Sequence, residues 1–174
     1  MKIAVVTGGA QGIGKGITQA LLTQGWRVAV LDQDAEAVRD LSDELPTAKL
    51  ITIRADVASE RDVEKAFDKI AAWTKAVEET EGIDLLVSNA GLANPVSGPI
   101  EKLELKKWQA WQDSHVTGSF LMVRAAVPLL RQRKGAIVVM ASTRAVQSEP
   151  DTEAYAAAKG AVDTFTIGLS REVA

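Results

Sequence analysis

Residues 3–14 read Ile-Ala-Val-Val-Thr-Gly-Gly-Ala-Gln-Gly-Ile-Gly, a short apolar run that leads directly into a glycine-rich stretch. The run predicts a strand covered on both faces, and the residues from Ile13 onward predict a helix. Glycines at such a junction let the backbone approach a pyrophosphate closely, because a Cβ would obstruct it, and the helix N-terminus offers free N–H groups. The alternative is a glycine-rich turn without a ligand. The residues expected to line this loop are Gly8, Gln11, Gly12, Ile13 and Gly14.

Short apolar runs and longer helical stretches alternate along the rest of the chain. Strands are expected at Ile3–Thr7, Arg27–Leu31, Leu50–Arg54, Leu85–Ser88 and Ala136–Ala141. Helices are expected at Ile13–Gln24, Ala35–Leu45, Glu60–Glu79, Leu105–Arg131 and Glu153–Val173. Gly25 and Gly82 suit helix stops, and Asp34 and Ser59 suit N-caps. The alternation predicts an α/β domain with a parallel sheet and right-handed crossovers, with residues 1–174 as one unit.

Composition removes several classes of function. The 174 residues carry a net charge of -3, which gives no sign of a nucleic-acid or membrane-surface partner. Without cysteine, no disulfide, thiolate metal site or cysteine nucleophile can form. No metal site is expected. No window approaches about 18 uninterrupted apolar residues, so no membrane span is expected and a cytoplasmic location is the default.

Asp32 closes the second expected strand, eighteen residues beyond Gly14. A carboxylate there can bind the hydroxyls of an adenosine ribose and repel a 2′-phosphate, which favours NAD over NADP. The competing interpretation is that Asp32 caps the next helix, a role for which Asp34 is also placed. Lys15 weakens the preference for NAD slightly, since a basic residue near the loop can serve a phosphate.

Ser142, Tyr155 and Lys159 form the expected catalytic set. Tyr155, the only tyrosine, and Lys159 stand at i and i+4 on a helix and share one face. A phenol is a weak base at neutral pH, but an ammonium within roughly 4–6 Å lowers its pKa by about 1–3 units. Ser142 ends the fifth strand, at the edge where ligands of parallel sheets bind, and its hydroxyl could hold a substrate oxygen. A surface pair of tyrosine and lysine is the alternative.

With these residues in place, the chain resembles the short-chain dehydrogenase/reductase family over essentially its whole length. Residues 7–14 match the family's TGxxxGxG loop, and Ala55-Asp56-Val57 matches the segment whose aspartate contacts adenine. Ser88-Asn89-Ala90-Gly91 resembles its NNAG motif, and Ser142 with Tyr155 and Lys159 matches its catalytic serine and YxxxK. The resemblance implies a Rossmann-like doubly wound sheet of order 3-2-1-4-5. It also places Asn89, Ala90 and Gly91 along the cofactor cleft, although Asn89 is more often a strand-stabilising residue.

The chain departs from the family pattern at three places. His115, the only histidine, stands where the family usually has an asparagine whose main chain helps hold a water beside the catalytic lysine. A titrating histidine could join that relay, and a histidine that packs within the helix is the other interpretation. The third helix is extended toward Glu81. Two further strands and the substrate lid of the family are not in the sequence, so Ile137–Met140 would form an apolar sheet edge.

The leading expectation is an NAD-dependent oxidoreductase that acts on a secondary alcohol or ketone through Ser142, Tyr155 and Lys159. The alternatives are a nucleotide-binding chain without turnover and an assembly module. A sugar-nucleotide epimerase fits less well, because the usual TGxxGxxG spacing is not matched. The resemblance implies a homodimer or homotetramer, with Trp108, Trp111, Phe120 and Phe165 as candidate anchors, although ordinary core packing is the more common role for any one of them. A hydroxylated or acidic substrate would suit Arg144, Gln147 and Glu149.

Overall fold

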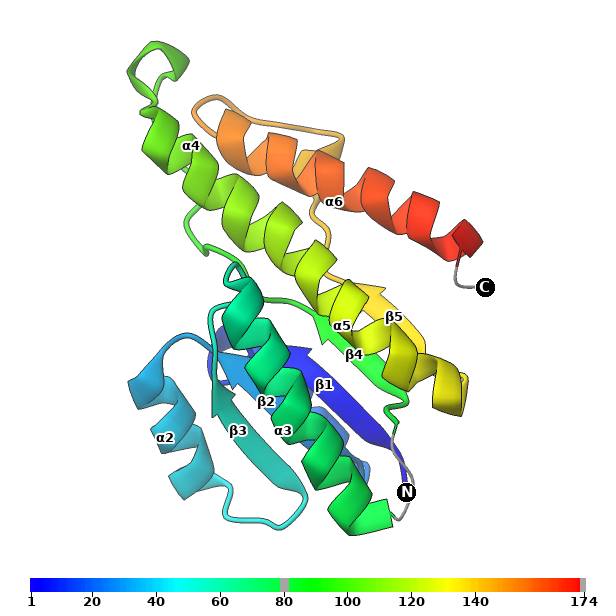
Figure 1. The fold of residues 1–174 in the computed structure, drawn as a ribbon. Helices are drawn as coiled ribbons and strands as arrows, with labels where there is room; N and C mark the ends of the chain where they lie inside the picture. Colours follow the sequence, from blue (N-terminus) through cyan, green and yellow to red (C-terminus); the bar gives the residue numbers. More distant parts are fainter. Residues whose placement is uncertain (79–81, 173–174) are drawn as a thin grey trace.

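Two hydrophobic cores lie on opposite faces of one sheet, because alternate side chains along a strand point to opposite sides. On β1 (Ile3–Thr7), Ile3 and Val5 belong to one core and Val6 to the other. On β2 (Arg27–Asp32), Leu31 and Val30 divide in the same way. The computed structural model, which describes residues 1–78 and 82–172, therefore shows strands buried on both sides, as the unalternated apolar runs predict (Figure 1).

The sheet has the order β3-β2-β1-β4-β5, and every neighbouring pair is parallel, which confirms the predicted topology. The remaining strands are β3 (Leu50–Arg54), β4 (Leu85–Ser88) and β5 (Ala136–Val139). The strand order reverses between β1 and β4, so the loops after these two strands diverge and leave a crevice at their carboxyl ends. This crevice is where ligands of open α/β sheets bind.

The helices cover both faces of the sheet, and α3 and α5 lie over the face nearest the viewer in Figure 1. The helices are α1 (Gly12–Thr23), α2 (Ala35–Glu44), α3 (Glu60–Glu78), α4 (Leu105–Gln112), α5 (Gly118–Arg133) and α6 (Glu153–Glu172). Short helical turns stand at η1 (Ile100–Lys102), η2 (Asp113–Thr117) and η3 (Thr143–Ala145). The helix ends agree with the expected caps, since Asp34 accepts hydrogen bonds from the backbone N–H groups of Glu36 and Ala37.

One expected element is wrong in its details. The sequence predicts a single helix over Leu105–Arg131, but the structure divides this span into α4, a π-helical turn at Asp113–Thr117 and α5. We call the middle segment the π-turn. A π-turn inserts an extra residue into a helical turn and so changes which side chains face inward. Periodicity cannot reveal it, because the helical spacing is the same on either side. The extension of the third helix beyond Glu78 lies outside the described residues.

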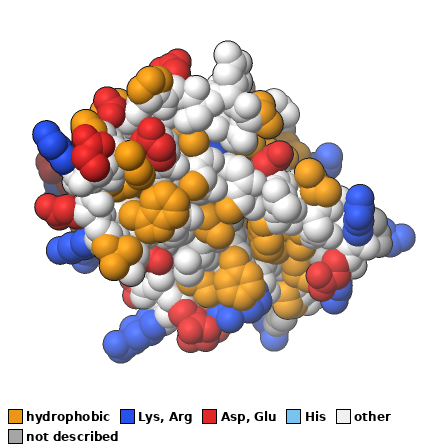
Figure 2. Space-filling model, turned by 90° about the horizontal axis from the view of Figure 1, so that it is seen from above, with side chains coloured by type: hydrophobic (Ala, Val, Ile, Leu, Met, Phe, Trp, Pro, Cys, Tyr) orange, Lys and Arg blue, Asp and Glu red, His pale blue; other side chains and the backbone are white. Residues whose placement is uncertain are grey.

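The expected anchors of an oligomer divide into two kinds. Trp111 is only 3% exposed and packs inside the chain, so it belongs to the core, which is the interpretation that the sequence favours for any one of these aromatic residues. Phe120 is 45% exposed, and Val138 on the edge strand β5 is 46% exposed, so both remain candidates for a contact. Seen from above the end that carries α4 and α6, hydrophobic side chains gather across the middle of the surface, with charged ones mostly around its edge (Figure 2). No helix in the described part of the chain is long and apolar enough to cross a membrane.

Candidate functional site

The glycine loop joins β1 to α1 and has a backbone geometry that favours glycine. Gly8 and Gly12 have φ of +59° and +54°, in the left-handed region. A Cβ on Gly14 would stand 2.0 Å from the carbonyl oxygen of Gly8, so the loop and helix are in direct backbone contact there. At Gly12 a Cβ would meet nothing within 4 Å, which shows that this face of the loop is open. Because Gln11 makes no side-chain capping bond, the first N–H groups of α1 stay free for a ligand.

Asp32 holds this loop by a hydrogen bond to its backbone. Its carboxylate is 6% exposed and accepts hydrogen bonds from the backbone N–H groups of Ala10 at 3.2 Å and Asp34 at 3.1 Å. The interpretation that Asp32 caps α2 is wrong, because the Asp34 carboxylate does so. Asp32 also lines the large cleft described below, so it remains in place to meet a ribose.

The loop after β4 is fastened to the glycine loop by side-chain to backbone hydrogen bonds. Asn89 donates through Nδ2 to the carbonyl oxygens of Thr7 at 2.9 Å and Gly8 at 3.3 Å. The Thr7 hydroxyl accepts from the backbone N–H groups of Asn89 and Ala90, each at 2.9 Å. Asn89 is thus a structural residue that holds the ends of β1 and β4 together, as the sequence favours.

Tyr155 and Lys159 lie together on α6, as their spacing predicts. Lys159 is 6% exposed, its Nζ donates to the carbonyl oxygen of Met140 at 2.6 Å, and this nitrogen lies 5.8 Å from the centre of the Tyr155 ring. Burial lowers the pKa of Lys159 from its ordinary value, since a charged amine is less stable away from water. Ser142 follows β5, and its Oγ accepts from the Arg144 N–H at 3.2 Å, which leaves its own proton free to donate.

His115 lies in the same cluster, on the π-turn. Its ring stacks on Trp111 at 5.4 Å between centroids and meets Tyr155 edge-to-face at 5.5 Å. Burial first, and the positive charge of Lys159 second, lower its pKa from 6.5 to about 4, so the imidazole is neutral at pH 7. The expectation that His115 titrates near neutral pH is therefore wrong, and a packed histidine describes it better.

A single cleft of about 830 Å³ collects the predicted residues. It is lined by Gly8, Gln11, Gly12, Ile13, Gly14, Asp32, Asp56, Val57, Asn89, Ala90, Gly91, His115, Tyr155 and Lys159. Ser142 is the one predicted site residue that does not line it. Sequence reasoning missed Trp111 as a neighbour of the site and Met140 as the partner of Lys159. The i, i+4 spacing of Trp111 and His115 could have indicated that Trp111 lies beside the site. A backbone acceptor such as the Met140 carbonyl leaves no signal in the sequence.

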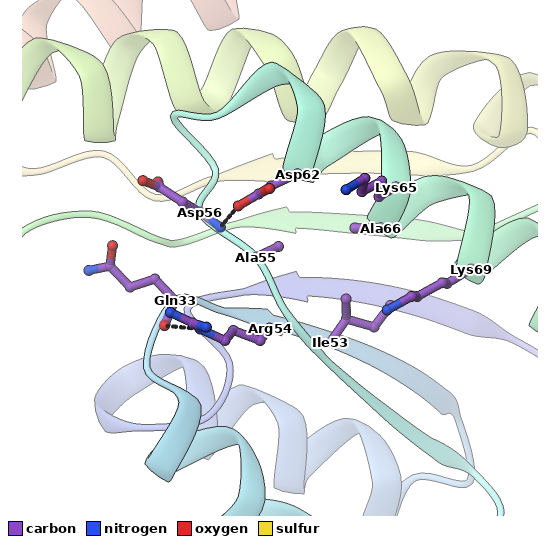
Figure 3. Close-up of a pocket in the computed structure, with 9 residues that line it drawn as sticks. All are labelled: Gln33, Ile53, Arg54, Ala55, Asp56, Asp62, Lys65, Ala66 and Lys69. Carbon is purple, nitrogen blue, oxygen red and sulfur yellow. Dashed lines mark hydrogen bonds between the residues drawn. The ribbon is translucent and has the colours of Figure 1, made fainter.

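A second hollow of about 490 Å³ lies between β3 and α3 and shares Gln33, Ala55 and Asp56 with the cleft (Figure 3). Lys65 and Lys69 on α3 are part of its lining, and so is Arg54. The Asp62 carboxylate accepts from the backbone N–H of Asp56 at 3.3 Å, so it mainly braces the start of α3. The lining mixes basic and acidic groups.

Comparisons with known proteins agree with this geometry. The family model described as short chain dehydrogenase matches residues 2–174. An uncharacterized oxidoreductase of Thermotoga maritima is 37% identical over 172 residues, which cover 97% of this chain and 64% of the relative. The chain thus spans slightly less than two thirds of that relative's length.

Two solved structures share the fold. The 3-ketoacyl-(acyl-carrier-protein) reductase of Brucella melitensis, complexed with NADH, has a TM-score of 0.88 and 26% identity, and the match covers 99% of this chain and 70% of that one. The closed form of serine dehydrogenase, complexed with NADP+, has a TM-score of 0.88 and 29% identity, and the match covers 98% and 66%. One of these structures is complexed with NADH and the other with NADP+, so the fold alone does not choose between the two dinucleotides.

Proposed function

Because the chain belongs to the short-chain dehydrogenase family, we propose that it binds a nicotinamide dinucleotide in the large cleft and exchanges a hydride with a secondary alcohol or ketone. The observation that carries the proposal is the meeting of two independent features in one cleft. The glycine loop lies at one part of its wall, and Tyr155 with Lys159 lies at another. Either feature alone is common, whereas a phosphate-binding loop beside a paired phenol and amine is suited to one kind of chemistry.

The residues of the cleft fit a dinucleotide. The open face at Gly12 and the free N–H groups of α1 suit a pyrophosphate, whose negative charge the helix N-terminus stabilises. Asp32 ends β2, and Asp56 follows β3. Both line the cleft, which suits contacts with the ribose and the adenine at one end of a dinucleotide. We favour NAD over NADP, because a 2′-phosphate would come close to the Asp32 carboxylate.

Each member of the catalytic set has a distinct task in this proposal. The nicotinamide supplies or takes the hydride when the dinucleotide is bound. During oxidation of an alcohol, Tyr155 accepts the hydroxyl proton as a phenolate, and during reduction of a ketone its phenol donates that proton back. The Lys159 ammonium stabilises the phenolate by its charge. Ser142 donates its free proton to the substrate oxygen and so holds it in place.

Binding and turnover test the proposal separately. A dinucleotide at 100 times its Kd adds about 2.7 kcal/mol to the free energy of unfolding, which a thermal-shift assay detects. We expect a shift with NAD, and absence of any shift with NAD and NADP would sink the proposal. Nicotinamide absorbance across a panel of secondary alcohols and ketones then measures turnover.

Tyr155→Phe is the decisive variant for the chemistry. It removes one hydroxyl, so we expect lost turnover with an unchanged thermal shift from NAD. Ser148→Ala removes a hydroxyl from the loop before α6 and serves as a control that should keep activity. A Tyr155→Phe variant that still turns over would contradict the assigned mechanism. A wild-type chain that binds NAD but never turns over would favour the second candidate, a nucleotide-binding chain.

A further inference from the structure

In the described part of the chain, three basic side chains that form no ion pair line the hollow between β3 and α3. Lys65 and Lys69 come from α3 and Arg54 comes from β3, and all three are exposed. Arg54 donates through Nε to the carbonyl oxygen of Gln33 at 3.4 Å, and its two terminal nitrogens have no partner among the described residues. The positive charge at this hollow is therefore available to a ligand.

The order of charges along α3 places the lysines on a different face from Glu64 and Asp68. Arg61, Lys65 and Lys69 follow one another at i, i+4 and i+8, so one face of the helix carries three positive charges in a row. Glu64 and Asp68 stand directly before the two lysines, and adjacent residues of a helix do not face each other. Because like charges at i and i+4 destabilise a helix, the row does not serve the stability of α3.

The two carboxylates that line the hollow are held by backbone N–H groups. Asp62 accepts from the N–H of Asp56 at 3.3 Å, and Asp56 accepts from the N–H of Ala58 at 2.9 Å. Figure 3 shows the Asp56 carboxylate extending away from Lys65 and Lys69. Since the partial positive charge of an N–H group offsets part of each negative charge, the lysines dominate the charge at their end of the hollow.

The size and the place of the hollow suit a small anionic ligand. Its volume of about 490 Å³ lies within the range of roughly 300–1,000 Å³ that is typical of small-molecule sites. Lys69 reaches from α3 toward Ile53 of β3, so its ammonium lies over the hollow (Figure 3). The hollow and the large cleft share Gln33, Ala55 and Asp56, so a ligand here would lie directly beside a bound dinucleotide.

We propose that the hollow binds a phosphate group of a small molecule other than the dinucleotide, with Lys65, Lys69 and Arg54 as its cationic contacts. Lysine ammoniums donate charge-assisted hydrogen bonds to phosphate oxygens, and an arginine guanidinium presents two donors at once. None of the described residues of the glycine loop lines the hollow, so this phosphate site is distinct from the one proposed for the pyrophosphate of the dinucleotide. The inference goes beyond the proposed function and does not depend on it.

Inorganic pyrophosphate is the probe, because it offers several phosphate oxygens to the three cations. Isothermal titration calorimetry measures its Kd at low ionic strength, since salt screens exposed charges. We expect binding to the wild type and a Kd about 10-fold higher for the double variant Lys65→Gln/Lys69→Gln, at about threefold for each exposed ammonium. No binding to the wild type, or equal Kd values for the two chains, would overturn the proposal.

Two further double variants separate contacts in the hollow from a general effect of charge. Lys65→Arg/Lys69→Arg keeps both positive charges and should bind pyrophosphate like the wild type. Lys102→Gln/Lys106→Gln removes two exposed lysines, also four residues apart, that do not line the hollow, and it should leave the Kd unchanged. A rise in Kd in this control as large as in Lys65→Gln/Lys69→Gln would reduce the effect to net charge and contradict the site.

The unliganded double variant gives a check on folding. Lys65→Gln/Lys69→Gln removes a repulsion within α3, so its Tm without pyrophosphate should not fall below that of the wild type. The loss of binding is then a loss of contacts and not of structure. A lower Tm would contradict the inference that the row of positive charges does not stabilise α3.

Competition with dinucleotides identifies where the phosphate binds. Pyrophosphate should bind with the same Kd in saturating NAD, and loss of binding would place it on the glycine loop and overturn the proposal. The ribose of NADP is a second source of phosphate. If Lys65→Gln/Lys69→Gln raises the Kd for NADP but not for pyrophosphate, the hollow belongs to the cofactor and a separate ligand is refuted. If NAD does not bind at all, the proposed function fails, while the lysine variants still decide the role of the hollow.

Discussion

When the pH falls from 7 to 5, the protonation of His115 by itself should lower the free energy of unfolding by a measurable amount. The folded chain lowers the pKa of this imidazole from 6.5 to about 4, chiefly by burial. Between these two values the unfolded chain binds the proton and the folded chain does not. The free energy of unfolding therefore falls as the pH falls through this window, and the contribution of His115 is fully restored above pH 6.5.

The size of the effect follows from the two pKa values. Each pKa unit between folded and unfolded chain corresponds to about 1.4 kcal/mol, so the limit below pH 4 is about 3 kcal/mol. At pH 5, where most of the window has been crossed, the loss relative to pH 7 is about 2 kcal/mol. Denaturant unfolding of the wild type and of His115→Asn at both pH values measures it. The stability difference between the two chains should change by that amount, in favour of the variant at low pH.

The comparison isolates His115 because the other charges are common to both chains. Lys159 and Tyr155 face the ring from α6, and Asp113 lies on its own turn, but none of them is changed. Carboxylates that protonate at low pH affect both chains alike. Parallel stability curves for the wild type and His115→Asn between pH 7 and pH 5 would refute the burial of a neutral imidazole.

Three further substitutions probe the frame of the cleft. Gly14→Ala places a Cβ 2.0 Å from the Gly8 carbonyl, so it should abolish the thermal shift with NAD, whereas Gly16→Ala should keep it; a normal shift in Gly14→Ala would be a contradiction. Thr7→Val leaves the part-buried N–H groups of Asn89 and Ala90 without their acceptor and should cost about 1–3 kcal/mol in denaturant unfolding, most of it recovered by Thr7→Ser. Asp32→Ala should weaken binding of both dinucleotides and shift the preference, measured as the ratio of the two Kd values, toward NADP. An unchanged ratio would mean that Asp32 only supports the loop.

The glycine loop, the parallel sheet and the pair of Tyr155 and Lys159 could be predicted, because each depends on residues close together in the sequence. Gly8 and Gly12 need backbone angles that other residues rarely adopt, and their place between an apolar run and a helix predicts both loop and sheet. Strands buried on both faces are short, unalternated apolar runs, so their alternation with helices along the chain predicts the parallel topology. Tyr155 and Lys159 share a helical face by spacing alone.

The interior of the site was not predictable, because it depends on contacts between distant segments. Nothing in the residues near Gln112 distinguishes a π-turn from an ordinary helix. The pKa of His115 depends on burial by three segments, so its ordinary value of 6.5 does not show which of the two sequence interpretations holds, the titrating relay or the packed histidine. The double hydrogen bond of Asp32 to Ala10 and Asp34 likewise needs the folded loop, although the choice of Asp34 as N-cap could be read from its position.

Burial acts in the same direction on Lys159 and His115, which both lie beside Tyr155. Desolvation lowers the pKa of both side chains, and for His115 the pKa falls to about 4, so the imidazole is uncharged at neutral pH. The charge of Lys159 adds to the effect on His115, since two adjacent cations would repel. A neutral ring at this place leaves the Lys159 ammonium to act on the phenol without a competing charge at position 115. A charged lysine at position 115 would compete for that role, and the aromatic packing on Trp111 would be lost. The departure from asparagine at His115 is therefore compatible with the proposed chemistry because the fold keeps the imidazole uncharged.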